Sequence, residues 1–131
     1  PVLKIENVEF IDLQYTDTTV ERERFLADNN ITIKKIDNID NFKDLNGVCS
    51  LIDICDFVVT ISNTNAHIAG ALGKKTFLLL PKGKGRIWYW TIKNKKSIWY
   101  PTIEIIEQKE SGIWETVIDE LHHKIKDNLI E

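Results

Sequence analysis

The sequence predicts a three-layer α/β domain in which helices cover both faces of a mostly parallel sheet of five strands. Short apolar runs rich in β-branched residues alternate with stretches of helical periodicity, and this alternation is typical of parallel strands joined by right-handed crossovers. The chain has 131 residues, near the common size of a domain, and its 43% hydrophobic content is sufficient for one core. We therefore expect residues 1–131 to form a single domain.

Strands and helices are predicted in alternation along most of the chain. The predicted strands are Val8–Tyr15, Ile31–Ile36, Phe57–Ile61, Thr76–Leu80 and Ile103–Glu107, and the predicted helices are Thr18–Asp28, Leu45–Cys55, Ala66–Leu72 and Gly112–Leu129. With the strands numbered along the chain, we expect them to be parallel in the order 2-1-3-4-5. The connection from Lys82 to Thr102 is too long for a plain link, which indicates a functional or mobile segment.

Two helices and one strand have the clearest signatures. Phe57–Ile61 is an apolar, β-branched run of the kind buried on both faces of a parallel sheet. The helix after it follows polar residues that can cap it, and it stops at Gly73, a residue type favoured just past a helix end. The last helix carries apolar residues at four-residue steps, so one of its faces should be buried. These residues are Ile113, Val117, Leu121 and Ile125.

The turn between the third strand and its helix is a candidate anion site. The residues directly after the apolar run are Ser62, Asn63, Thr64 and Asn65. The free N–H groups and the positive dipole end of the helix then face the carboxyl edge of the sheet, where doubly wound folds bind phosphates. His67 lies in the first turn of this helix, and no second His or Cys lies at metal-ligand spacing. An ordinary crossover with a polar cap would carry similar residues, and this alternative remains open.

Basic side chains follow the fourth strand at the same edge of the predicted sheet. Lys82, Lys84 and Arg86 come directly after Thr76–Leu80, so they emerge beside the polar turn, where cations can neutralise a diphosphate. Arg86 is the better candidate for a bidentate contact. A solvated loop of lysines and glycines has the same composition. The tryptophans of this segment can either pack the loop against the domain or stack on a base or a sugar.

The segment 61–76 reads ISNTNAHIAGALGKKT. It resembles the signature of the nucleotide-sugar-binding half of GT-B glycosyltransferases. More narrowly, it is similar to the glycosyltransferase domain that follows tetratricopeptide (TPR) repeats in many bacterial proteins, which is related to the heptosyltransferases. The shared positions are Thr64, Ala66, His67 and the run from Ala69 to Gly73, with Pro81 closing the next strand. Asn63 stands where the family usually has Asp, a change that removes a charge but keeps a capping oxygen.

Shorter matches extend the resemblance over nearly the whole chain. They are Phe10–Tyr15, which is similar to a family strand that ends in Leu-Gln, Leu51–Val59, Trp88–Trp90 and Ile98–Pro101. Tyr89 stands where many relatives have Arg. Several short matches in the right order are more specific than one motif.

The resemblance implies a Rossmann-like donor-binding domain of a metal-independent glycosyltransferase that needs no cofactor. Its ligand would be a nucleoside diphosphate sugar, and the implied substrate-binding residues are Asn63, Thr64, Asn65, His67, Gln14 and Arg86. An acceptor hydroxyl would displace the nucleoside diphosphate, with the general base supplied by an N-terminal domain of the same protein. This sequence contains neither that domain nor an earlier strand typical of the family. We therefore expect a fragment that is inactive alone and has a sheet edge open to homodimer formation.

Composition limits the other classes of partner. The net charge of −3 argues against a nucleic-acid-binding domain, because such domains normally carry a basic excess. Cys49 and Cys55 have neither zinc-site nor CxxC spacing. Two unpaired cysteines, with no signal peptide and no apolar run of about 18 residues, favour a cytoplasmic protein without a membrane span.

Two other functions remain open. A catalytically silent interaction or scaffold module with the same fold would tolerate Asn63 and Tyr89 in place of charged residues. A flavodoxin-like or receiver-type regulatory domain needs clustered acidic residues at the strand ends, whereas this chain has Gln14, Ser62 and Pro81 there. Nucleotide binding would separate the glycosyltransferase and scaffold readings from the regulatory one, and turnover by the full-length protein would separate the first two.

Overall fold

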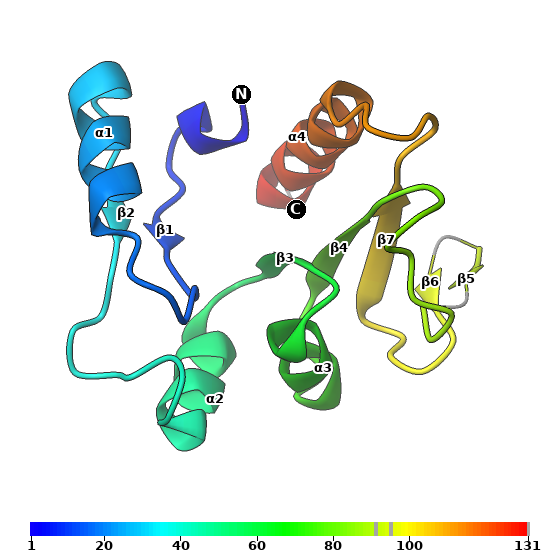
Figure 1. Cartoon of the computed structure of the whole chain (residues 1–131), viewed down its shortest axis with the longest axis horizontal. Helices are drawn as coiled ribbons and strands as arrows, with labels where there is room; N and C mark the ends of the chain where they lie inside the picture. The colour runs from blue at the N-terminus through cyan, green and yellow to red at the C-terminus, as the bar shows by residue number, and fades with distance from the viewer. Residues whose placement is uncertain (91, 95, 131) are drawn as a thin grey trace.

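The computed structural model describes residues 1–90, 92–94 and 96–130, and their fold is mixed α/β (Figure 1). The helices are the short 3-10 helix η1 (Val2–Lys4), α1 (Thr19–Asn29), α2 (Leu45–Ile54), α3 (Thr64–Ala71) and α4 (Glu115–Ile130). The predicted α/β class is confirmed, and each predicted α-helix is present with small shifts at its ends. Within the described residues, no helix is both long enough and apolar enough to cross a membrane.

The larger sheet joins five strands among the described residues, in the order β3-β4-β7-β6-β5. Its parallel part consists of β3 (Val58–Ile61), β4 (Thr76–Leu80) and β7 (Ile103–Glu107). The short strands β6 (Lys96–Ser97) and β5 (Ile92–Lys93) continue it in antiparallel orientation. All five residues of β4 are buried, as expected for an apolar strand with a parallel neighbour on each side.

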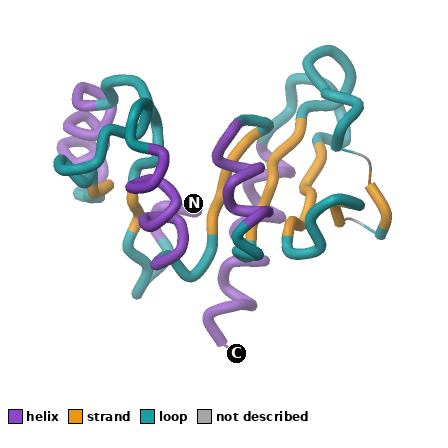
Figure 2. Tube along the Cα trace, turned by 90° about the horizontal axis from the view of Figure 1, so that it is seen from below, coloured by secondary structure: helices purple, strands orange, loops and turns teal. Residues whose placement is uncertain are grey.

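The first two strands form a sheet of their own, so the prediction of one mostly parallel, five-stranded sheet in the order 2-1-3-4-5 is wrong. β1 (Phe10–Ile11) pairs in parallel with β2 (Ile33–Lys34), and neither joins β3. Both views show this pair and α1 at one end of the molecule, beyond α2 (Figure 1 and Figure 2). Within the described residues the outer edge of β3 therefore has no partner strand.

β1 is much shorter than the predicted strand Val8–Tyr15 because the chain turns at Asp12. The buried Asp12 carboxylate accepts the backbone N–H of Gln14 at 2.8 Å and the hydroxyl of Thr18. A side-chain acceptor that bonds the backbone two residues on forms an Asx turn, which ends an extended segment. Asp12 thus terminates β1 and leads the chain towards α1.

No strand was predicted in the long connection after β4, which contains the β5–β6 hairpin. Lys93 faces Lys96 across the hairpin, and Asn94 in the turn has a φ of 52°. Asn tolerates this left-handed conformation better than most residues do. Since each strand has two residues and carries lysine, no run of apolar or alternating residues marks the hairpin in the sequence.

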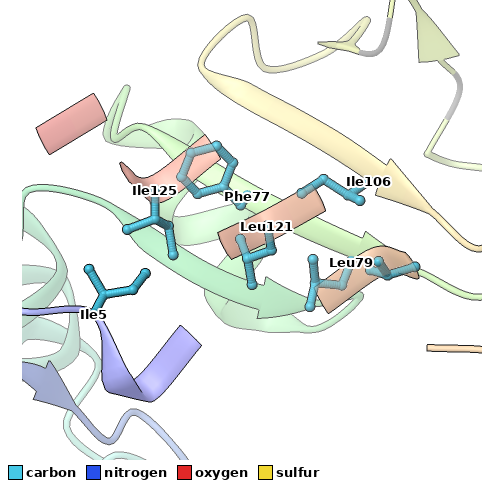
Figure 3. Packing of buried hydrophobic residues seen from close by; sticks show 7 residues of the cluster. Ile5, Phe77, Leu79, Ile106, Leu121 and Ile125 are labelled. Carbon is cyan, nitrogen blue, oxygen red and sulfur yellow. The ribbon is translucent and has the colours of Figure 1, made fainter. Parts of the chain in front are cut away.

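Helix α4 covers one face of the parallel strands (Figure 1). Figure 3 shows its apolar side chains against those of β4 and β7, together with Ile5 from the N-terminal segment. The predicted stripe is confirmed at Val117, Leu121 and Ile125, each at most 2% exposed. Ile113 is 43% exposed because it precedes the first residue of α4.

Helices α2 and α3 lie on the opposite face (Figure 1). Ala66 of α3 packs with Leu78 and Trp90, and Ala69 packs with Val58 of β3. Small residues on α3 let the helix approach the sheet closely. The N-terminus of α3 is thereby fixed beside the carboxyl ends of β3 and β4.

Candidate functional site

Asn63 caps helix α3 at the carboxyl end of β3. Its Oδ1 atom accepts the backbone N–H of Ala66 at 3.2 Å and the hydroxyl of Thr60 at 3.0 Å. Both bonds use the side chain as an acceptor, which an amide oxygen provides as a carboxylate does. Asn63 therefore performs the capping role without a negative charge at the helix terminus.

Ser62 and Asn65 join this turn to two other parts of the chain. The Ser62 hydroxyl accepts the indole N–H of Trp90 at 2.8 Å. The Asn65 side chain donates to the carbonyl oxygen of Leu13 at 3.2 Å, which brings the segment after β1 to the N-terminus of α3. Side chains of the turn thus hold both the segment after β1 and the segment after β4 in place.

Gln14 lies next to that contact on an exposed part of the chain. Its carbonyl oxygen accepts the Asn41 side chain at 3.0 Å and the Lys35 ammonium at 2.6 Å. The predicted residue Gln14 therefore lies one residue from Leu13, the hydrogen-bond partner of Asn65. The backbone carbonyl of Gln14 is already bound by protein donors. Thr64, the first residue of α3, is exposed.

His67 is half-buried among three aromatic side chains. Its ring centroid lies 4.9 Å from that of Trp90, 5.0 Å from Tyr89 and 5.9 Å from Tyr100. Its Nδ1 atom lies 3.2 Å from the hydroxyl oxygen of Tyr100. Nε2 has no hydrogen-bond partner among the described residues and is not sealed from solvent. The imidazole is thus held in place with one nitrogen left for a ligand.

Tyr100 packs directly on helix α3 because position 70 is glycine. A Cβ atom on Gly70 would lie 2.4 Å from Cγ of Tyr100, which is inside van der Waals contact. Tyr89 and Trp99 stack at 5.5 Å with an interplanar angle of 17°, and the Trp99 indole N–H donates to the Tyr89 carbonyl at 3.1 Å. These rings hold the segment after β4 against α3.

The predicted phosphate ligand Arg86 contacts protein groups at the carboxyl end of β7 and in the segment after β4. Its Nε atom lies 2.5 Å from Oε1 of Glu107, and its guanidinium also donates to the Trp90 carbonyl at 3.2 Å. Glu107 ends β7, and neighbouring parallel strands end at the same sheet edge, so the ion pair is a consequence of topology. The ammonium of Lys82 is likewise bonded within the protein, because it donates to the Lys109 carbonyl at 2.6 Å. Lys84 is exposed.

Sequence reasoning named the neighbours of Tyr100 without giving it a role. The Trp-Tyr-Pro element at 99–101 was a possible signal, but its contact with His67 spans 33 residues. Tyr89 also lies in this network, since its hydroxyl donates to that of Tyr100 at 3.4 Å. This hydrogen bond, together with burial, raises the pKa of Tyr89.

Comparison with known proteins identifies one distant relative and no family. The chain is 28% identical over 128 residues to Protein FlbA of Caulobacter vibrioides (strain ATCC 19089 / CIP 103742 / CB 15), a match that covers 97% of this chain and 21% of FlbA. The chain therefore spans about a fifth of that relative's length. No family model matches the chain. No solved structure matches it.

Proposed function

We propose that this chain is a Rossmann-like donor-binding domain of a glycosyltransferase and that it holds the diphosphate of a nucleoside diphosphate sugar at the N-terminus of α3. The proposal rests on the immobilised ring of His67 and on its Nε2 atom, which is unpartnered among the described residues. Its ring is fixed by three aromatic side chains and by a hydrogen bond to Nδ1, while Nε2 remains unpartnered within the described residues. A side chain held in this way is prepared to bind a ligand with little loss of conformational entropy.

Two further features support an anionic ligand. The N-terminus of α3 presents backbone N–H groups at the carboxyl edge of parallel strands, and its dipole favours negative charge there. The sequence from Phe57 to Ile103 contains eight Lys or Arg residues and no Asp or Glu, although the chain as a whole has a net charge of −3. The site is therefore built from the electropositive part of the chain.

Under this proposal the domain stabilises a leaving group. An acceptor hydroxyl displaces the nucleoside diphosphate from the anomeric carbon, and the α3 amides and His67 stabilise the charge that develops on the departing diphosphate. The general base comes from another part of the full-length protein. Arg86 acts indirectly, because its pairing with Glu107 and the Trp90 carbonyl fixes the segment that carries the aromatic rings.

A catalytically silent scaffold module is the second candidate. The specific observation in its favour is that Arg86 and Lys82 are bound by protein groups, which leaves less free positive charge at the turn. A module that has lost catalysis would need the aromatic packing and would not need the ligand. Failure to bind nucleotide would leave only the scaffold module, and sugar transfer by the full-length protein would exclude it.

The test is the affinity of the purified chain for UDP, ADP and GDP, measured by calorimetry. Half of a substrate cleft should give a Kd of about 0.1–1 mM, equivalent to about 4–5.5 kcal/mol. His67→Ala should weaken binding by about 1–2 kcal/mol, the range for a hydrogen bond to a charged group. The matched control is His122→Ala, because His122 lies on α4 at the opposite face of the sheet.

The outcomes of this experiment bear differently on the two candidates. The donor-binding function predicts binding of at least one nucleotide, loss on His67→Ala and no change on His122→Ala. Absence of binding of all three nucleotides at millimolar concentration would leave only the scaffold function. Equal affinities of wild type and His67→Ala would refute the proposed site.

A further inference from the structure

Two tyrosine hydroxyls form a hydrogen-bonded chain that ends on His67. The Tyr89 hydroxyl lies 3.4 Å from the Tyr100 hydroxyl, which in turn lies 3.2 Å from Nδ1 of His67. Three ionisable groups from two segments thus share two hydrogen bonds. The direction of these bonds decides which imidazole nitrogen carries the proton.

The chemistry of the donors favours one direction. A phenol hydroxyl is a stronger donor than a neutral imidazole N–H, and an imidazole nitrogen is a stronger acceptor than a phenol oxygen. Tyr100 therefore donates to Nδ1, and Tyr89 donates to Tyr100. Since a neutral imidazole carries one proton, it then resides on Nε2.

The surroundings of His67 offer no negative charge that would favour the imidazolium. The elements packed around the ring are α3 and the segment after β4, and both lie within the stretch from Phe57 to Ile103 that has no carboxylate. The titratable side chains that face the ring are those of Tyr89 and Tyr100. Within the described residues His67 forms no ion pair.

We infer that Tyr100 is a positioning residue that holds His67 as the neutral Nε2–H tautomer, so that the site offers an uncharged N–H donor. That the donor meets a diphosphate oxygen rests on the proposed function; the tautomer itself does not. Tyr100 can do this because Gly70 admits its ring against α3, which sets the height of its hydroxyl relative to His67.

The test is a long-range ¹H–¹⁵N correlation spectrum of the ¹⁵N-labelled chain at pH 7.5, which reports the protonation of each imidazole nitrogen. His67 should show a protonated Nε2 and an unprotonated Nδ1. His123 is an internal reference of the opposite kind, because its Nδ1 lies 2.7 Å from the Asp119 carbonyl oxygen, which can only accept a hydrogen bond. A protonated Nδ1 on His67 would overturn the inference without any variant.

Two phenylalanine variants distinguish the effect of each tyrosine hydroxyl on the His67 tautomer from the effect of its ring. Tyr100→Phe keeps the ring on Gly70 and should move both His67 nitrogens towards the averaged shifts of a free imidazole. Tyr89→Phe should leave the tautomer in place, because the bond from Tyr100 to Nδ1 remains. Unchanged His67 shifts in a folded Tyr100→Phe chain would refute the positioning role, and the amide spectrum reports whether the variant is folded.

The affinity for a nucleotide sugar tests the role of Tyr100 in binding separately from the proposed function of the domain. UDP-glucose is a suitable probe because its diphosphate bears no group that titrates near neutrality. Its Kd at pH 7.5 should rise about three- to tenfold on Tyr100→Phe and stay within twofold on Tyr89→Phe, because the hydrogen bond between Tyr100 and Nδ1 remains in the second variant. An unchanged Kd in a folded Tyr100→Phe chain would refute the role of Tyr100 in presenting the Nε2–H donor to the ligand. No binding with the expected tautomer would refute the proposed function and leave the assignment of Tyr100 to the His67 tautomer intact.

Discussion

Replacement of Gly70 by alanine tests whether Tyr100 packs on α3 as described. The added Cβ would lie 2.4 Å from Cγ and 2.7 and 2.8 Å from the two Cδ atoms of the Tyr100 ring. Overpacking of this kind costs about 1–3 kcal/mol, whereas Gly to Ala in a helix stabilises by about 0.5–1 kcal/mol. We expect a net loss of up to about 2.5 kcal/mol in the free energy of unfolding.

The assay is urea denaturation followed by tryptophan fluorescence, with Ala71→Gly as the control for helix propensity on the exposed side of α3. The sign should reverse in a Tyr100→Ala background, where Gly70→Ala should stabilise by about 0.5–1 kcal/mol because the clash is gone. If Gly70→Ala stabilised the chain with Tyr100 present, the ring would not lie on position 70. The role assigned to Tyr100 would then lose its structural basis.

Two further predictions follow from ionisable groups away from the site. Burial raises the pKa of the Cys55 thiol, so iodoacetamide should modify Cys55 at pH 8 several-fold more slowly in the folded chain than in urea, and an equal rate would contradict the burial. Hydrogen bonds from the Thr19 hydroxyl and backbone N–H lower the pKa of Asp17, so its contribution to stability is present above the ordinary Asp range and is lost as the pH falls through the lowered value. Denaturation curves of wild type and Asp17→Ala should therefore differ at neutral pH and converge between about pH 4 and 2; a constant difference would show that the carboxylate charge is not involved.

The sequence predicted the strands around the site well because their signals are local. β4 and β7 have the predicted bounds, since each is an apolar run that ends at a polar or turn residue. α3 begins within two residues of its predicted start because polar capping residues directly follow β3. In these elements the local pattern and the tertiary burial agree.

The remaining differences arise from contacts between distant residues. Asp12 shortens β1 through its bonds to Gln14 and Thr18, and a polar residue inside an apolar run does not reveal this turn. Arg86 pairs with Glu107, a partner 21 residues away that is brought close by the ends of neighbouring strands. A sequence shows that a cationic side chain is present but not which carboxylate it pairs with in the folded chain.

The imidazole environment was the least predictable part of the site. His67 was expected to act with backbone amides, and its enclosure by Tyr89, Trp90 and Tyr100 depends on how the segment after β4 folds back. That path includes the β5–β6 hairpin, which has almost no sequence signal. The position of Gly70 beneath Tyr100 could not be read from the helix pattern either.

Amide chemical-shift mapping with a nucleoside diphosphate shows directly whether a diphosphate binds at the N-terminus of α3. The full chain is titrated with UDP, ADP and GDP while backbone ¹H–¹⁵N shifts are followed to saturation. We expect the largest shifts to cluster from Asn63 to Gly70, with smaller ones at Leu13, whose carbonyl accepts the Asn65 side chain, and at the adjoining Gln14. Saturating nucleotide that leaves the amides of Asn63 to Gly70 unshifted would contradict a diphosphate site at the N-terminus of α3.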